Sequence, residues 1–146
     1  MAGLSFASED EDFVSGNGYY RMQNGSGKLL LQGLSQIYGK SPRLYLFGFS
    51  GGAQFVTRFA EAYPEQVDRW CAYAGRVSDP LAPRADSPRA YLLCGDADER
   101  LAEVKDYYQN GIAAARPWQL RIVPQSGHEI AVGEYPEIFR FLTPLR

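Results

Sequence analysis

Hydrophobic residues in this chain gather in short blocks that are separated by polar and turn-forming residues. Four blocks are predominantly apolar: Leu44–Phe49, Trp70–Ala74, Ala90–Cys94 and Leu120–Val123. A short apolar run between turn signals is typical of a strand that is buried on both faces, as in a parallel sheet. The pattern therefore predicts four buried strands.

Four further segments are predicted to be helices: Lys28–Tyr38, Gly52–Tyr63, Glu99–Asn110 and Tyr135–Leu142. Three of them carry apolar residues at spacings of three and four, which places those residues on one face. The expected buried positions are Leu30, Leu31, Leu34, Ile37, Phe55, Val56, Phe59, Ala60, Ile138, Phe139 and Leu142. Strands that alternate with helices indicate the α/β class, with helices packed on a mostly parallel sheet.

The junction of the first strand and the next helix carries a chemical motif. Gly48-Phe49-Ser50-Gly51-Gly52 has the Gly-x-Ser-x-Gly pattern, and it lies between a strand and a helix. A nucleophile elbow needs this order of elements, because the serine sits on a tight, strained turn between them. The helix N-terminus adds free amides where an oxyanion would form. Ser50 is the candidate nucleophile, and Gly51 N–H is a candidate oxyanion donor.

A nucleophilic serine needs a base, and His128 is the single histidine in the chain. It follows the last predicted strand on a loop, from which an imidazole can reach a neighbouring strand end. One histidine and two separated cysteines do not form a zinc ligand set, so we expect no metal.

Three carboxylates could complete a triad, because Asp96, Asp98 and Glu99 all follow the strand that ends at Cys94. Asp96 is suited to closing the turn after Gly95, and Glu99 to the first turn of a helix. Asp98 is preferred, although it could also cap the following helix.

The order Ser50, Asp98, His128 on successive strand ends resembles the α/β-hydrolase superfamily, from about Arg43 to the C-terminus. The likeness is greatest to small esterases, dienelactone hydrolases and polyhydroxybutyrate-depolymerase-like enzymes. It rests on the elbow, on Gly95-Asp96-Ala97-Asp98 and on Gly127-His128-Glu129. It implies a serine hydrolase that cleaves an ester, thioester or amide without a cofactor, a carboxylic ester more readily than a peptide. The acyl substrate is expected to be a small molecule.

Compared with that superfamily, the chain corresponds to the C-terminal portion of a doubly wound, mostly parallel sheet with helices on both faces. Leu4-Ser5-Phe6 resembles the fourth strand of the superfamily, and the third strand, with the loop that gives the second oxyanion donor, is missing. Residues 1–146 are therefore expected to be one N-terminally incomplete domain. An unpaired edge on the Leu44–Phe49 strand would invite a partner strand or a second copy of the chain.

Residues 7–27 are rich in acids and turn residues, and they form either a solvated loop or a flap over Ser50. As a flap they would bring Phe13, Tyr19 or Tyr20 to an acyl pocket, which Phe49 beside the serine would also line.

The composition changes this picture little. The chain has 146 residues, 45% of them hydrophobic, which suits one globular domain. A formal net charge of −2 indicates neither nucleic-acid nor membrane-surface binding. The two cysteines are expected to be buried thiols, consistent with a cytoplasmic location. The alternative to an enzyme is a catalytically impaired or truncated hydrolase-like domain that acts as a binding module or has no activity alone.

Overall fold

The computed structural model describes residues 18–40, 42–75 and 87–143. The predictions for Phe13, the acidic run at 9–12, the strand at 4–6 and most of the loop at 77–88 lie outside these residues. Within them, every strand and helix that the hydrophobic pattern predicts is present.

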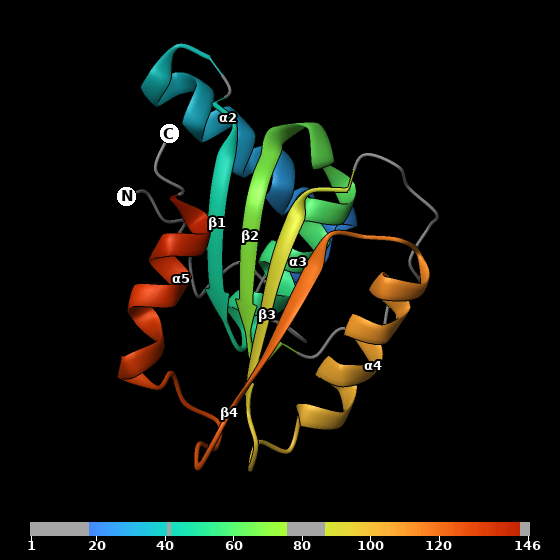
Figure 1. The fold of residues 1–146 in the computed structure, drawn as a ribbon. Coiled ribbons are helices and arrows are strands. Elements are labelled where there is room, and N and C mark those ends of the chain that lie inside the picture. The colour runs from blue at the N-terminus through green and yellow to red at the C-terminus, as the bar shows by residue number, and fades with distance from the viewer. Residues whose placement is uncertain (1–17, 41, 76–86, 144–146) are drawn as a thin grey trace.

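The centre of the fold is a four-stranded sheet in the order β1-β2-β3-β4, with every pair parallel (Figure 1). The strands are β1 (Leu44–Phe49), β2 (Val67–Tyr73), β3 (Arg89–Gly95) and β4 (Trp118–Val123). Because the strands run in chain order and parallel, their carboxyl ends meet at one edge of the sheet. In α/β folds this is the edge where ligands bind.

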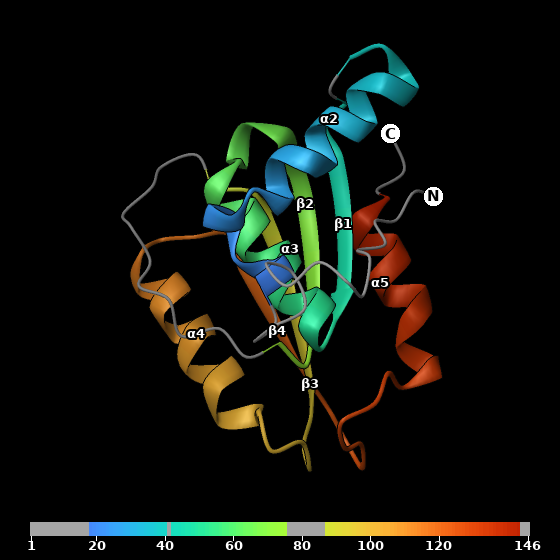
Figure 2. The same cartoon turned by 180° about the vertical axis from the view of Figure 1, so that it is seen from behind.

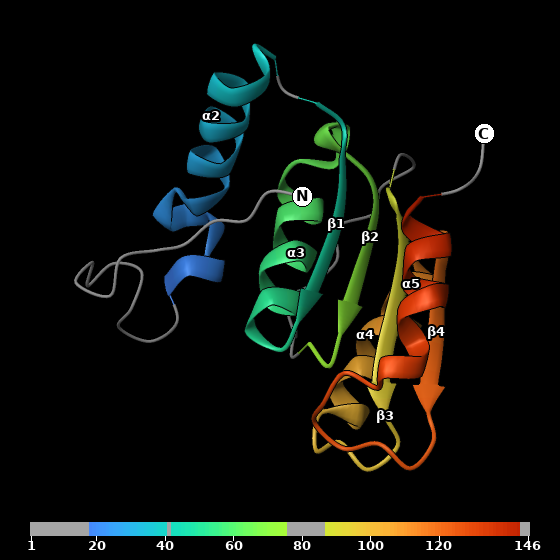
Figure 3. The ribbon, with the colours of Figure 1, turned by 90° about the vertical axis from the view of Figure 1, so that its left-hand side faces the viewer.

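Helices cover both faces of the sheet, which confirms the predicted fold class. Helices α3 (Gly51–Ala62) and α4 (Leu101–Ala113) lie on one face, and α5 (Tyr135–Leu142) lies on the other (Figure 3). Helix α2 (Ser26–Tyr38) lies on the α3 side, farther from the sheet, as the view from behind shows (Figure 2). Short 3-10 turns occupy Gly18–Tyr20, Met22–Asn24, Pro64–Gln66 and Val132–Glu134.

The core lies between the two central strands and the helices. β2 and β3 are almost entirely buried, as their continuous apolar sequence predicts. The largest fully buried side chains include Trp70, Tyr73, Phe59 and Leu93. Trp118 of β4 meets Trp70 edge-on, with ring centroids 5.5 Å apart. The end of the sheet that carries the strands' carboxyl ends is thus built on a rigid, close-packed base.

Two predicted core positions are wrong. Ile37, in the last turn of α2, is 69% exposed, because contact with the core along α2 is made earlier in the helix, by Leu30 and Leu31. Phe139 is 51% exposed and stacks on Tyr135, one turn earlier in the chain. Helix α5 turns Ile138 and Leu142 into the core instead, as predicted for those two residues.

Strand β1 has a strand neighbour on one side only within the described residues. Tyr45 and Phe47 are exposed there, at 49% and 38%. A cleft of about 440 Å³ lies between β1 and α2, lined by residues such as Leu34 and Leu46. None of the helices in the described ranges is both long and apolar enough to cross a membrane.

Candidate active site

Ser50 occupies the tight turn between β1 and α3. Its backbone has φ 53° and ψ −115°, a left-handed conformation that is strained for a residue with a side chain. The turn is held from both sides, because Ser50 N donates to the carbonyl of Tyr73 at 2.9 Å and Ser50 C=O accepts from Gln54 N at 3.2 Å. These two hydrogen bonds maintain the strained conformation, which places the hydroxyl above the carboxyl edge of the sheet.

The elbow depends on Gly48, where β1 passes under the start of α3. A Cβ at this position would overlap the backbone of Gly52 and Ala53. Since the first bond inside α3 is donated by Gln54, the amides of residues 51–53 have no partner in the helix. The Gly51 N–H is therefore beside the serine at the positive end of a helix dipole, as the sequence predicts.

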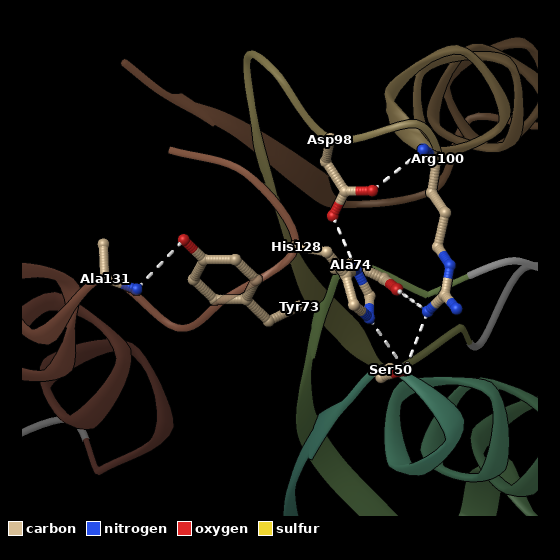
Figure 4. Close-up of polar contacts among 7 residues, drawn as sticks. All are labelled: Ser50, Tyr73, Ala74, Asp98, Arg100, His128 and Ala131. Carbon is tan, nitrogen blue, oxygen red and sulfur yellow. Dashed lines mark hydrogen bonds and ion pairs between the residues drawn. The ribbon is translucent and has the colours of Figure 1, made fainter. Parts of the chain in front are cut away.

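His128 reaches Ser50 from the loop after β4. Its Nε2 lies 3.0 Å from Ser50 Oγ, and its side chain is 35% exposed (Figure 4). The imidazole stacks on the ring of Phe49, with centroids 5.0 Å apart and planes at 29°. Phe49, expected to contact substrate, thus supports the histidine. Farther along the same loop, the Ala131 amide donates to the Tyr73 hydroxyl at 3.4 Å.

Asp98 is the carboxylate that meets the imidazole. Its Oδ2 lies 2.8 Å from His128 Nδ1, and its Oδ1 accepts the Arg100 amide at 2.9 Å (Figure 4). Asp96 and Glu99 are both exposed. Asp96 accepts the Ser126 amide at 3.3 Å, which closes the turn as expected. Of the three carboxylates left open by the sequence, Asp98 alone bonds to the histidine.

Asp98 is not the N-cap of the following helix, which was the alternative role that the sequence left open. Helix α4 begins at Leu101, two residues later than predicted, and its N-cap is Arg100, with no side-chain cap bond. The bond from the Arg100 amide to Asp98 fixes the turn before the helix instead. The two bonds of Asp98 use different oxygen atoms, so one side chain holds both the imidazole and this turn.

The surroundings of Asp98 favour its charged form. Its side chain is fully buried, and burial alone would raise its pKa. Hydrogen bonds from the Arg100 amide and from His128, and the charges of both residues, outweigh burial and lower the pKa below its usual value. The Cys94 thiol beside it behaves oppositely, since burial and then the Asp98 charge raise its pKa to about 12. The site thus holds an ionised carboxylate and a protonated thiol.

The remaining predicted site residues that the structure describes are Tyr19 and Tyr20. Tyr19 lies on the elbow, because a Cβ added at Gly51 would overlap the Tyr19 hydroxyl. Burial raises the Tyr19 pKa, so the hydroxyl keeps its proton at neutral pH. Tyr20 packs edge-on against Tyr19 and under the Arg58 guanidinium.

Arg100 is a site residue that sequence reasoning missed. Its Nη1 donates to Ser50 Oγ at 2.7 Å and to the Ala74 carbonyl at 3.1 Å (Figure 4). An arginine at the start of a helix has no distinguishing signal in one sequence, because such side chains usually face solvent. Among the described residues, no group of three histidine, cysteine or acidic side chains could hold a metal ion.

Comparisons with known proteins identify the fold. No known protein family matches the sequence, and no curated protein matches it significantly. Among solved structures, esterase PE8 is similar over 84% of this chain, with a TM-score of 0.71 and 23% identity. A CIB-like hydrolase from Thermoplasma acidophilum is similar over 94% of the chain and 62% of its own, with a TM-score of 0.64 and 22% identity.

A third similar structure, from Bacteroides ovatus, is named as a dipeptidyl aminopeptidase IV. It aligns with 80% of this chain and 22% of its own, at a TM-score of 0.68 and 16% identity. The chain thus has an α/β-hydrolase fold, as the resemblance predicted, and corresponds to its C-terminal portion. It spans about 60% of the length of esterase PE8.

Proposed function

We propose that this chain carries the catalytic centre of a serine hydrolase. One observation supports this most directly: Ser50 Oγ, His128 Nε2, His128 Nδ1 and Asp98 Oδ2 form a continuous hydrogen-bonded chain, with steps of 3.0 and 2.8 Å. Nucleophile, base and orienting carboxylate in this order are what acyl transfer to serine requires.

In the proposed reaction, His128 Nε2 takes the Ser50 proton as Oγ attacks the acyl carbonyl carbon. Asp98, held ionised by its hydrogen bonds, keeps the ring proton on Nδ1 and stabilises the imidazolium. The imidazolium then gives its proton to the leaving oxygen, sulfur or nitrogen, which leaves an acyl-serine. Water activated by the same imidazole releases the acid and restores Ser50.

The tetrahedral oxyanion would form against the N-terminus of α3. Gly51 N–H is the first donor in this proposal, because it follows the nucleophile and has no partner inside the helix. The Tyr19 hydroxyl is our candidate for the second donor, since it lies against Gly51 and stays protonated at neutral pH. Two donors fixed in advance stabilise the developing charge without reorganisation.

We propose a carboxylic ester of a small acid as the substrate, ahead of a thioester or an amide. The similar structures include an esterase, but also a protein named as a peptidase, so the bond type needs its own test. The proposed mechanism needs no metal or cofactor. We further propose a cytoplasmic location, supported by two buried cysteines that are free thiols.

A fluorophosphonate probe tests the nucleophile directly, because it reacts covalently with an activated serine. We expect the probe to label the wild-type chain and Ser35→Ala, an exposed serine on α2 that serves as the matched control. Labelling should be lost in Ser50→Ala with an unchanged circular dichroism spectrum. Equal labelling of the Ser50→Ala chain would refute the assignment. Release of p-nitrophenol from an ester, compared with p-nitroaniline from an amide, then identifies the bond.

A second candidate function is a binding module without turnover. It is favoured by the β1 edge, which has no strand neighbour on its outer side among the described residues and exposes Tyr45 and Phe47. An edge strand of this kind can pair with another chain or with a second copy. A folded, monodisperse wild-type chain that the probe does not label would favour this candidate over the enzyme.

A further inference from the structure

The guanidinium of Arg100 lies directly on the proposed nucleophile. Its Nη1 is 2.7 Å from Ser50 Oγ, although the two residues are 50 positions apart in sequence (Figure 4). The same nitrogen donates to the Ala74 carbonyl at 3.1 Å. A positive charge therefore lies within hydrogen-bond distance of the atom that would attack the substrate.

This position is built into the backbone. The Arg100 amide is fixed by Asp98 Oδ1 at 2.9 Å, immediately before α4 begins. At the other end, the carbonyl that holds the guanidinium belongs to Ala74, which follows β2 with φ 54°. Strained residues of this kind persist only where the surroundings hold them, and they gather at functional sites. Arg100 is thus anchored at both ends of its side chain.

The Arg100 guanidinium makes no ion pair at contact distance in the part of the chain that the structure describes, although its charge acts on Asp98. Two other arginines show the usual arrangement: Arg116 meets Glu61 at 2.6 Å, and Arg121 meets Glu134 at 3.2 Å. The buried carboxylate of Asp98, two residues earlier, has its two oxygens engaged by His128 and by the Arg100 amide.

The guanidinium also has unused donors. It offers five N–H groups, and both of its hydrogen bonds leave from Nη1. Its Nε is buried and has no hydrogen-bond partner. A buried donor without an acceptor is costly, and the planar guanidinium matches planar or tetrahedral oxyanions, carboxylates among them. The unmet capacity is thus of the kind that a bound carboxylate would fill.

We propose that Arg100 is a specificity-determining residue that binds a substrate carboxylate close to the scissile carbonyl. The role of Arg100 in selecting a substrate rests on the proposed function, whereas its binding of a carboxylate does not. Both hydrogens of Nη1 are engaged by Ser50 Oγ and the Ala74 carbonyl, so the carboxylate would bind at Nη2, the neighbouring nitrogen of the same guanidinium. A carboxylate separated from the scissile carbonyl by one or two methylene groups would reach it. The carboxylate could belong to the acid or to the alcohol of the ester.

Binding is tested without any turnover. Butyrate and its neutral isostere butyramide form one pair of probes, and glycolate and ethanol form the other. Each probe is titrated into the ¹⁵N-labelled chain, and the Arg100 Nε–H resonance is followed. We expect butyrate and glycolate to bind about 10- to 100-fold more tightly than their neutral counterparts, in line with a charged hydrogen bond. The preference should disappear in Arg100→Gln, shrink in Arg100→Lys and survive in Arg140→Gln, an exposed arginine on α5.

Equal affinities within both pairs in the folded wild-type chain would overturn the proposal, whatever the fluorophosphonate probe shows. Conversely, a carboxylate preference in a chain that the probe does not label would keep the anion site and remove the serine hydrolase. The two failures are therefore distinguishable, and neither depends on a variant that has to fold.

Hydrolysis measured by pH-stat then locates the carboxylate. Monomethyl succinate against methyl butyrate tests the acid side, and acetoxyacetate against ethyl acetate tests the alcohol side. We expect the enzyme to prefer the anionic ester in one pair, mainly through a lower KM. In Arg100→Gln this preference should be about 10- to 100-fold smaller than in Arg140→Gln. A preference that Arg100→Gln leaves intact would overturn it.

Discussion

Replacing Asp98 by asparagine changes one atom of a side chain that is fully buried, and the consequences follow from its two hydrogen bonds. In the wild-type chain, Oδ1 accepts the Arg100 amide at 2.9 Å and Oδ2 accepts from His128 Nδ1 at 2.8 Å. Asparagine has one oxygen and one NH₂ group, so it can serve only one of these donors.

If the oxygen keeps the Arg100 amide, the NH₂ group faces His128 Nδ1. The ring proton then moves to Nε2, which can no longer accept the proton of Ser50. If the oxygen instead serves Nδ1–H, two buried donors oppose each other, which costs about 1–3 kcal/mol. Either way, the imidazolium loses a charged hydrogen bond that is worth about 1.5–3 kcal/mol. Together these terms predict a fall of about 10²- to 10⁴-fold in the rate of acylation.

The assay is the second-order rate constant for fluorophosphonate labelling, followed by kcat/KM on an ester once one is found. Asp96→Asn is the matched control, because Asp96 is exposed and accepts only the Ser126 amide at 3.3 Å. We expect it to stay within about threefold of wild type, as substitutions at exposed positions usually do. A rate for Asp98→Asn within about tenfold of wild type, in a chain with unchanged urea unfolding, would refute the reasoning.

Three further predictions concern the same elements. Tyr19→Phe should lower kcat by about 10- to 100-fold if its hydroxyl helps to hold the oxyanion, whereas Tyr20→Phe should not; an equal effect of both changes would remove Tyr19 from this role. Gly48→Ala should lower the free energy of unfolding in urea by about 1–3 kcal/mol, because its Cβ overlaps backbone. Gly33→Ala, with open space in mid-helix, should raise it by about 0.5–1 kcal/mol, and the opposite order would contradict the packing argument. Because the pKa of Asp98 is lowered by folding, the stability it adds is present above its unfolded pKa of about 3.9 and is lost as pH falls through the folded value. The free energy of unfolding, measured in urea between pH 6 and pH 2, should therefore fall more steeply below about pH 4 in wild type than in Asp98→Asn. Parallel curves for the two chains would contradict this prediction.

The parts of the fold that a single sequence could predict are those set by neighbouring residues. The four apolar runs and the glycines around Ser50 specify strand, turn and helix within a few positions, and the structure has them there. The errors at Ile37 and Phe139 arise because the spacing of three and four marks a face of a helix but not how far the core extends along it.

The site needed information that sequence spacing does not hold. Three carboxylates within four positions competed, and local turn and helix preferences favoured Asp98 without excluding the others, because the choice depends on which oxygen meets an imidazole 30 residues away. Arg100 carries no local signal at all, because its role comes from contacts with Ser50 and Ala74 across the sheet edge. The stacking of the Phe49 ring on His128 is a further contact between distant parts of the chain, and a substrate contact of Phe49 stays a prediction.

Strand β2 explains how residues from opposite sides of the sheet keep hydrogen-bond distances. Ser50 follows β1 and His128 follows β4, and these strands are separated by β2 and β3. Tyr73, the last residue of β2, is fully buried and contacts both loops. Its carbonyl accepts the Ser50 amide at 2.9 Å, and its hydroxyl accepts the Ala131 amide at 3.4 Å. One buried residue, through its main-chain carbonyl and its side-chain hydroxyl, thus fixes the turn of the proposed nucleophile and the loop of its base, so the 3.0 Å between them is set by the core and not by either loop alone.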